Sequence, residues 1–215
     1  MSQHTLTLLR FTYKKLKEKL TVSDSKKLFH EQFPYVIPGL YKRIVDEMLV
    51  ELNLLNHQNE FTQCYLFCIG LTETFEELMK GYKPENQLDL LFDALCSSTN
   101  FEANEIKKIS KKSQDEFKDR SSKDTLKLLQ EKTDNKLYPS RILNLGIYKI
   151  ISNTQDLKGV NELEMNKIIS DIFENLNLSF NKAEKDIGIY KSSISKMEQA
   201  KELIEELKIK DKKKG

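Results

Sequence analysis

Apolar residues recur at intervals of three and four positions along most of the chain, which is the spacing of one face of an α-helix. The longest regular run predicts an amphipathic helix over about residues 38–56, with Pro38 at the first helical position, where proline is tolerated. A short helix is predicted before it at 26–32, and it ends at Phe33 because Pro34 disfavours the α conformation in the preceding residue. Its candidate N-caps are Ser23, Asp24 and Ser25.

Two further helices with apolar faces are predicted before residue 100. One spans about Thr62 to Lys80, and Gly81 is placed to adopt the left-handed conformation that closes a helix. The next begins at Pro84 and ends in the polar cluster 97–100. Its apolar face carries Leu88, Leu91, Phe92 and Leu95.

The same spacing returns after residue 140. Residues Arg141–Ser152 are apolar enough for a central core helix, in which Gly146 would let a neighbouring helix approach closely. A turn around 156–159 separates it from a helix over 161–176. Between these regions, residues 102–136 are polar with sparse apolar anchors, which predicts thin surface helices and mobile connections.

The last predicted helix runs from about 180 to 210, with Ser179 as its candidate cap, and is too long for a compact domain to bury. Apolar residues follow a heptad spacing as far as Met197, after which a second stripe takes over at Ala200, Leu203 and Leu207. This imperfect heptad predicts coiled-coil character and a helix that projects and pairs with a partner. The alternative is an ordinary amphipathic helix that folds back on the body.

Composition supports an all-α fold, a multi-helix globular body with a long C-terminal helix. The chain has 215 residues, 39% hydrophobic and 32% charged, with only seven glycines and four prolines, a balance that favours helices. We expect a basic extension over 1–20, a helical body over 21–178, and the long helix with a basic tail over 179–215.

Charge is uneven along the chain. Residues 1–20 carry a net charge of +4 and residues 201–215 carry +2, so the remainder is mildly acidic within a total of +2. Basic ends suit an anionic lipid surface or an acidic partner, although solvated tails are the simpler interpretation. The longest apolar run, Tyr65–Leu71, is too short to span a bilayer, no secretory signal is evident, and three cysteines fit a reducing compartment.

The residues that usually carry chemistry are scattered. The glycines are isolated, so no phosphate-binding loop is predicted, and only three histidines are available to activate a nucleophile. The carboxylate pairs Glu76–Glu77 and Glu205–Glu206 are interpreted as solvated helix faces. We assign no catalytic, cofactor-binding or metal-ligating residue, and expect no enzymatic activity, no cofactor and no small-molecule substrate.

The only candidate metal cluster comprises His57, Cys64 and Cys68, because the two thiols lie four residues apart on one helical face. Zinc sites usually draw four ligands from pairs joined by tight turns, and Cys96 is the only other thiol. Small apolar core residues are therefore the preferred interpretation of both cysteines. Basic and aromatic residues alternate at Arg10–Lys19, but the nearly balanced total charge argues against nucleic-acid binding.

Several segments resemble one known family in the same order along the chain. They are Thr21–Phe29 (TVSDSKKLF), 41–52 (YKRIVDEMLVEL), Phe75–Pro84 (FEELMKGYKP), Leu91–Cys96 (LFDALC), Ser140–Tyr148 (SRI and GIY) and Asp186–Ala200 (with YKSS and KMEQA). Together they resemble the thylakoid formation, or photosystem II biogenesis, family of cyanobacteria and plastids, over about residues 21–207.

The resemblance implies an all-helical protein without catalysis that associates peripherally with thylakoids and supports photosystem II assembly and repair. It also implies a link to the FtsH membrane protease. The expected location is the cytoplasmic face of a cyanobacterial thylakoid membrane, or the plastid stroma and thylakoid. Residues 1–20 precede the usual start of the family. Three interpretations of residues 1–20 are open: a transit-like extension, a membrane-touching helix, or an incorrect start site. The incorrect start site is favoured.

Three hypotheses follow. The leading one is an adaptor whose exposed faces and long last helix engage the FtsH protease or photosystem II assembly and repair components. The second is a peripheral lipid-binding protein that shapes thylakoid membranes through its basic ends. The third is a pigment or cofactor carrier that uses the apolar helices of 38–100.

Overall fold

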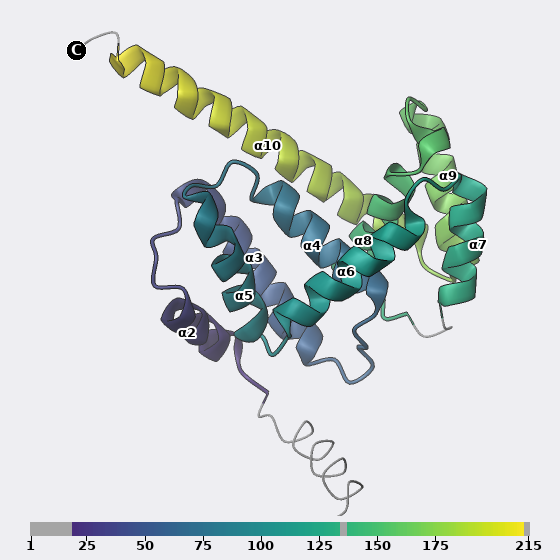
Figure 1. The fold of residues 1–215 in the computed structure, drawn as a ribbon, viewed down its shortest axis with the longest axis horizontal. Helices are drawn as coiled ribbons and strands as arrows, with labels where there is room; N and C mark the ends of the chain where they lie inside the picture. The colour runs from purple at the N-terminus through teal and green to yellow at the C-terminus, as the bar shows by residue number, and fades with distance from the viewer. Residues whose placement is uncertain (1–18, 134–136, 213–215) are drawn as a thin grey trace, which may run out of the picture.

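The computed structural model describes residues 19–133 and 137–212, and all regular structure in these ranges is helical (Figure 1). The all-α expectation is confirmed, including the long C-terminal helix. The helices are α2 (Val22–Gln32), α3 (Gly39–Asn56), α4 (Tyr65–Leu78), α5 (Leu88–Ser97), α6 (Ala103–Phe117), α7 (Ser122–Lys132), α8 (Arg141–Ser152), α9 (Glu162–Asn175) and α10 (Phe180–Lys212), with single 3-10 turns η1 (Glu85–Gln87) and η2 (Gln155–Leu157).

Helix ends follow local hydrogen bonding. Helix α2 is capped by Thr21, whose hydroxyl accepts from the backbone N–H of Asp24, while the Asp24 carboxylate accepts from the Thr21 N–H at 3.1 Å. This reciprocal capping box satisfies two backbone donors. The predicted caps Ser23, Asp24 and Ser25 are therefore wrong, because all three lie inside the first turn of the helix.

Helix α4 is shorter than the predicted span from Thr62 to Lys80. It begins after Cys64 and ends at Leu78, where the Met79 N–H still donates to the Phe75 carbonyl. Gly81 does adopt a left-handed conformation, with φ of +83°, but within the turn that follows the helix. The chain thus reverses over three residues before Pro84, and η1 leads into α5.

The centre of the molecule is the crossing of α4 and α8, which pack more extensively than any other pair of helices. Two glycines meet there: a Cβ built on Gly146 would overlap the Leu66 carbonyl oxygen, and one built on Gly70 would overlap the Ile142 carbonyl oxygen. The two backbones approach to a distance that no side chain allows. The predicted role of Gly146 is confirmed.

Helix α4 also separates two hydrophobic clusters. Phe67, Leu71 and Phe75 belong to the cluster formed with α2, α3 and α5. Leu66, Ile69 and Leu78 belong to the cluster formed with α8, α9 and α10. Because it is buried on nearly all sides, α4 carries the continuous apolar run of the sequence rather than a single stripe.

The polar region 102–136 differs from expectation, because α6 is not a thin surface helix but packs along α4. It buries Ile106 and Phe117, and also Ser110 and Ser113. The Ser110 hydroxyl lies 2.5 Å from the hydroxyl of buried Thr72 on α4. The hydrogen bond between Ser110 and Thr72 thus supplies part of the contact between α6 and α4. Residues 134–136, at the end of the predicted mobile region, lie outside the described residues.

Helix α10 has 33 residues and crosses the molecule before it extends past the body (Figure 1). Its first half packs against α8, α9 and α4. The buried residues of this half follow the predicted spacing: Ala183, Ile187, Tyr190 and Met197. The helix therefore folds back on the body over its first half and projects beyond Lys201, while its pairing with a partner stays a prediction. No helix in the described ranges is long and apolar enough to cross a membrane.

Candidate interaction surface

Helix α10 is fixed to the body by a partly buried polar cluster of Glu77 on α4, Lys149 on α8 and Tyr190 on α10. The Glu77 carboxylate accepts a hydrogen bond from the Tyr190 hydroxyl at 2.6 Å and forms an ion pair with the Lys149 ammonium group. The Lys149 nitrogen also lies 5.0 Å from the centroid of the Tyr190 ring. The Glu77 carboxylate thus joins three helices. Burial and the hydrogen bond to Glu77 raise the pKa of the Tyr190 hydroxyl.

Further polar contacts follow α10 along its length. Near its start, the Asn144 amide on α8 donates to Asp186 at 2.8 Å. Lys191 forms an ion pair with Glu162 on α9 at 3.2 Å. Near the edge of the body, the Lys201 ammonium group donates to the Lys80 carbonyl oxygen. These contacts fix the direction in which α10 leaves the body.

Acid should weaken this attachment through Glu77. Burial alone would raise the pKa of the Glu77 carboxyl, but hydrogen bonds from Lys149 and Tyr190 outweigh it and hold the pKa below its usual value of 4.5. A lowered folded-state pKa stabilises the fold above the unfolded-state pKa, and this stabilisation is lost as pH falls below about 4.5. The carboxylate side chain is 40% exposed, so solvent screening limits the contribution to about 1 kcal/mol.

The expected result is that Glu77→Gln lowers the free energy of unfolding by about 1 kcal/mol at pH 7 and by much less at pH 3. Urea denaturation of both proteins at the two pH values measures the difference. A deficit of equal size at both pH values would show that the Glu77 charge does not stabilise the fold.

Beyond Lys201 the helix presents apolar side chains to solvent. Leu203 is 61% exposed, Ile204 42% and Leu207 60%. Helical spacing places these three residues on one side, in line with Ala200. Glu202, Glu205 and Glu206 are exposed as well, which agrees with the prediction of a solvated face for Glu205–Glu206. We call residues 202–212 the free end of α10. Exposed apolar residues on one side of a helix, bordered by charged residues, are typical of a helix that binds a partner.

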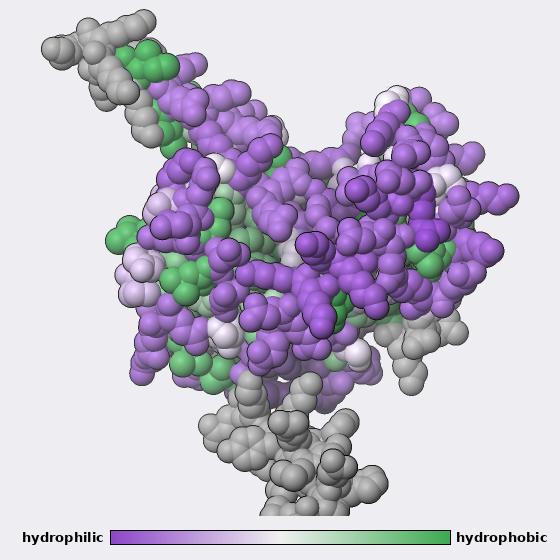
Figure 2. Space-filling model, viewed as in Figure 1, coloured by the Kyte–Doolittle hydropathy of each residue, from purple (hydrophilic) through white to green (hydrophobic). Residues whose placement is uncertain are grey.

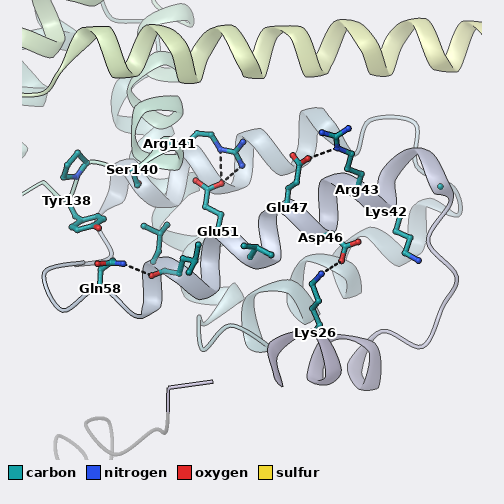
Figure 3. Close-up of a pocket in the computed structure, with 15 residues that line it drawn as sticks. Lys26, Lys42, Arg43, Asp46, Glu47, Glu51, Gln58, Tyr138, Ser140 and Arg141 are labelled. Carbon is teal, nitrogen blue, oxygen red and sulfur yellow. Dashed lines mark hydrogen bonds and ion pairs between the residues drawn. The ribbon is translucent and has the colours of Figure 1, made fainter. Parts of the chain in front are cut away.

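A second surface is an open groove of about 860 Å³ along the outer side of α3 (Figure 3). Three ion pairs cross it or border it: Lys26 with Asp46 at 3.3 Å, Arg43 with Glu47 at 2.8 Å, and Arg141 with Glu51. Val50, Leu54 and Leu55 supply apolar surface between them. Each of the three carboxylates already has a cationic partner, so the groove suits a polypeptide surface better than a charged small molecule.

The residues of the candidate metal cluster have other partners. His57 follows the end of α3, where its Nδ1 donates to the Asn53 carbonyl oxygen at 2.7 Å. Cys68 is fully buried, Cys64 is partly buried, and both pack with the apolar core. Burial raises the pKa of Cys68 to about 12, with a smaller contribution from nearby Cys64, so the thiol stays protonated. This agrees with the interpretation of the cysteines as small apolar core residues.

Sequence reasoning missed the polar cluster that holds α10. Glu77 was interpreted with Glu76 as part of a solvated face, but Glu77 is only partly exposed and its carboxylate is bonded to Lys149 and Tyr190. The signal available in the sequence was Lys149, the only charged residue after Arg141 in the helix of 141–152, because a lysine at a core position requires an ionic or hydrogen-bonding partner. The partner itself is 72 residues away along the chain.

These features define an all-α protein whose last helix is held by a polar cluster and extends past its body. The family model described as "Thylakoid formation protein" matches residues 21–138 and 127–215, and the chain belongs to this family. The family is named for thylakoid formation and not for a reaction.

Its relatives include cyanobacterial proteins named "Protein Thf1". The relative from Prochlorococcus marinus strain MIT 9312 is 80% identical, over 93% of this chain and 99% of the relative. That from Synechococcus sp. strain CC9605 is 39% identical, over 86% of this chain and 87% of the relative. A solved structure of Psb29 superposes with a TM-score of 0.81 at 25% identity, covering 91% of this chain and 98% of that one.

Proposed function

We propose that this protein is a non-catalytic accessory protein for photosystem II biogenesis and repair and for thylakoid membrane organisation, and that it acts as an adaptor to an FtsH-type membrane protease. Membership of the thylakoid formation family supports the setting. We place the protein at the cytoplasmic face of the thylakoid membrane, as a peripheral protein.

One observation carries the adaptor function: α10 continues past its hydrogen bond to the body at Lys201 and exposes Leu203, Ile204 and Leu207. Burying one such side chain against a partner is worth about 1.5–3 kcal/mol. A stripe left exposed in the monomer is therefore favourable to bury in a complex. The exposed glutamates beside it would select for basic groups at the rim of the partner.

The double substitution Leu203→Ser and Leu207→Ser should abolish recovery of the partner. Affinity isolation of the tagged protein from detergent-solubilised photosynthetic membranes, followed by mass spectrometry, tests this. The unchanged protein should recover FtsH subunits or photosystem II assembly factors after a salt wash. The amount recovered with the double variant should be lower by about tenfold or more.

The matched control is Ile189→Ser, because Ile189 is 54% exposed on the same helix but within the part that crosses the body. It should retain full recovery. Equal recovery by the double variant and the control would exclude the free end of α10 as the adaptor surface. Recovery of lipid alone by the unchanged protein would favour the alternative function, a peripheral lipid-binding protein that shapes thylakoid membranes directly.

A further inference from the structure

The loop between α2 and α3 exposes apolar side chains at the end of the molecule from which α10 projects (Figure 1). Val36 is 91% exposed and Tyr35 is 48% exposed, side by side in the sequence. Apolar surface gathers along this edge of the molecule in Figure 2. Two consecutive exposed side chains with apolar surface at the apex of the loop differ from the singly scattered apolar residues that are normal on a protein surface.

The loop is held in this shape by the core. Phe33 is fully buried, and its ring lies 5.9 Å from that of Phe29 and 5.3 Å from that of Tyr35. Ile37 packs against the first hydrophobic cluster on the other side of the apex. Pro34 and Pro38 restrict the backbone at both ends. Val36 is thus presented to solvent by anchored neighbours, and binding through it requires little ordering of the chain.

Four basic residues lie in two segments around the loop, and acidic Glu31, Asp46, Glu47 and Glu85 border these segments. The turn after α4 lies against the first turn of α3, because the Tyr41 hydroxyl donates to the Lys80 carbonyl oxygen at 3.3 Å and the Tyr41 and Tyr82 rings are 5.2 Å apart. The two segments that meet here, 33–45 and 79–84, contain four basic residues and no acidic residue. Glu47 and Glu85 pair with two of them, which leaves Lys42 and Lys80 without an ion-pair partner among the described residues.

We propose that the loop 33–38 inserts Val36 and Tyr35 into the interface of an anionic lipid membrane, while Lys42 and Lys80 contact the headgroups. A rigid apolar apex beside unpaired lysines matches an anionic bilayer in both polarity and charge. Tyr35 fits the interfacial layer because an aromatic ring with a hydroxyl tip is stable there. The proposal goes beyond the adaptor function and rests on it only for the presence of a membrane.

Vesicle co-sedimentation tests the proposal with the full chain. The unchanged protein should bind phosphatidylglycerol vesicles, bind phosphatidylcholine vesicles far less, and dissociate in 0.5 M salt, where the Debye length is only about 4–5 Å. Val36→Asp and Lys42→Glu should each reduce binding to the anionic vesicles by about fivefold or more. Both positions are exposed, so thermal unfolding should be unchanged.

Leu163→Asp is the matched control, since Leu163 is an 85% exposed apolar residue on α9, away from this end. It should bind vesicles as the unchanged protein does. If Val36→Asp binds as well as Leu163→Asp, the loop is not the lipid contact and the basic ends of the chain become the cause of binding. A change in oligomeric state of Val36→Asp without lipid would instead identify a second copy of the chain as the occupant, which also overturns the proposal.

The same variants separate this proposal from the adaptor function. In detergent extracts, where no bilayer is present, Val36→Asp should recover FtsH subunits normally, whereas the Leu203 and Leu207 double variant should not. Loss of partner recovery by Val36→Asp with normal vesicle binding would make the loop a protein contact and overturn the lipid proposal. Vesicle binding that depends on Val36, in a protein that recovers no partner, would support the lipid contact and reject the adaptor.

Discussion

Gly146→Ala is expected to lower the free energy of unfolding by about 3 kcal/mol or more. Overpacking a core usually costs about 1–3 kcal/mol, when flexible side chains can move aside. Here the added methyl group would meet the Leu66 carbonyl oxygen, which belongs to the backbone of a helix and cannot move alone. Helices α4 and α8 would have to separate along their whole contact. Urea denaturation followed by circular dichroism measures the effect.

Gly188→Ala is the matched control. Gly188 also lies in a helix, but a Cβ built there has no atom within 4 Å. The substitution should stabilise the protein by about 0.5–1 kcal/mol, since alanine favours the helical conformation more than glycine does. An unfolding curve for Gly146→Ala that coincides with that of the unchanged protein would mean that α4 and α8 are not in backbone contact.

Tyr190→Ala should give a loss of similar size, about 3–4 kcal/mol. The Tyr190 side chain is 6% exposed and packs in the second hydrophobic cluster, so its removal leaves a cavity. It also removes one of the two hydrogen bonds to the Glu77 carboxylate. Because Tyr190 holds the first half of α10 against the body, the variant should also be cleaved in α10 by trypsin faster than the unchanged protein under native conditions.

Tyr190→Phe separates the two contributions. It keeps the ring and loses only the hydroxyl, so the expected loss is about 1 kcal/mol. Trypsin cleavage in α10 should then remain close to that of the unchanged protein. If Phe and Ala at this position destabilise the protein equally, the hydrogen bond rather than the packing of the ring attaches α10 to the body.

Much of this fold is predictable from the spacing of apolar residues. The helix over 141–152 has the predicted bounds, and α3 begins within one residue of its own predicted start. The apolar residues of α3 mark one buried face, whereas α8 is buried on nearly all sides and is apolar along its whole length. Helix α6 was underestimated because part of its buried face consists of Ser110 and Ser113, whose hydroxyl groups lower the apparent hydrophobicity of the segment. A pattern based on apolar residues does not detect a buried serine such as Ser110, whose hydroxyl is hydrogen-bonded to Thr72.

The candidate surfaces were less predictable than the helices. The projection of α10 follows from its length and from the loss of its heptad frame after Met197, both of which are local properties of the sequence. The cluster of Glu77, Lys149 and Tyr190 joins residues up to 113 positions apart, and no local spacing encodes that contact. The exposure of Val36 depends on where Phe33 and Ile37 are anchored, which only the folded chain reveals. The predicted coiled-coil pairing stays a prediction.

The length of α10 gives the protein a defined reach. At about 1.5 Å per residue, the eleven residues after Lys201 extend roughly 16 Å beyond the last hydrogen bond to the body. An α-helix bends little over so short a distance. A partner bound at the free end of α10 would therefore be held at a nearly constant distance from the loop that carries Val36. The adaptor and lipid-contact proposals together require this separation, because each assigns a different surface to its own binding partner.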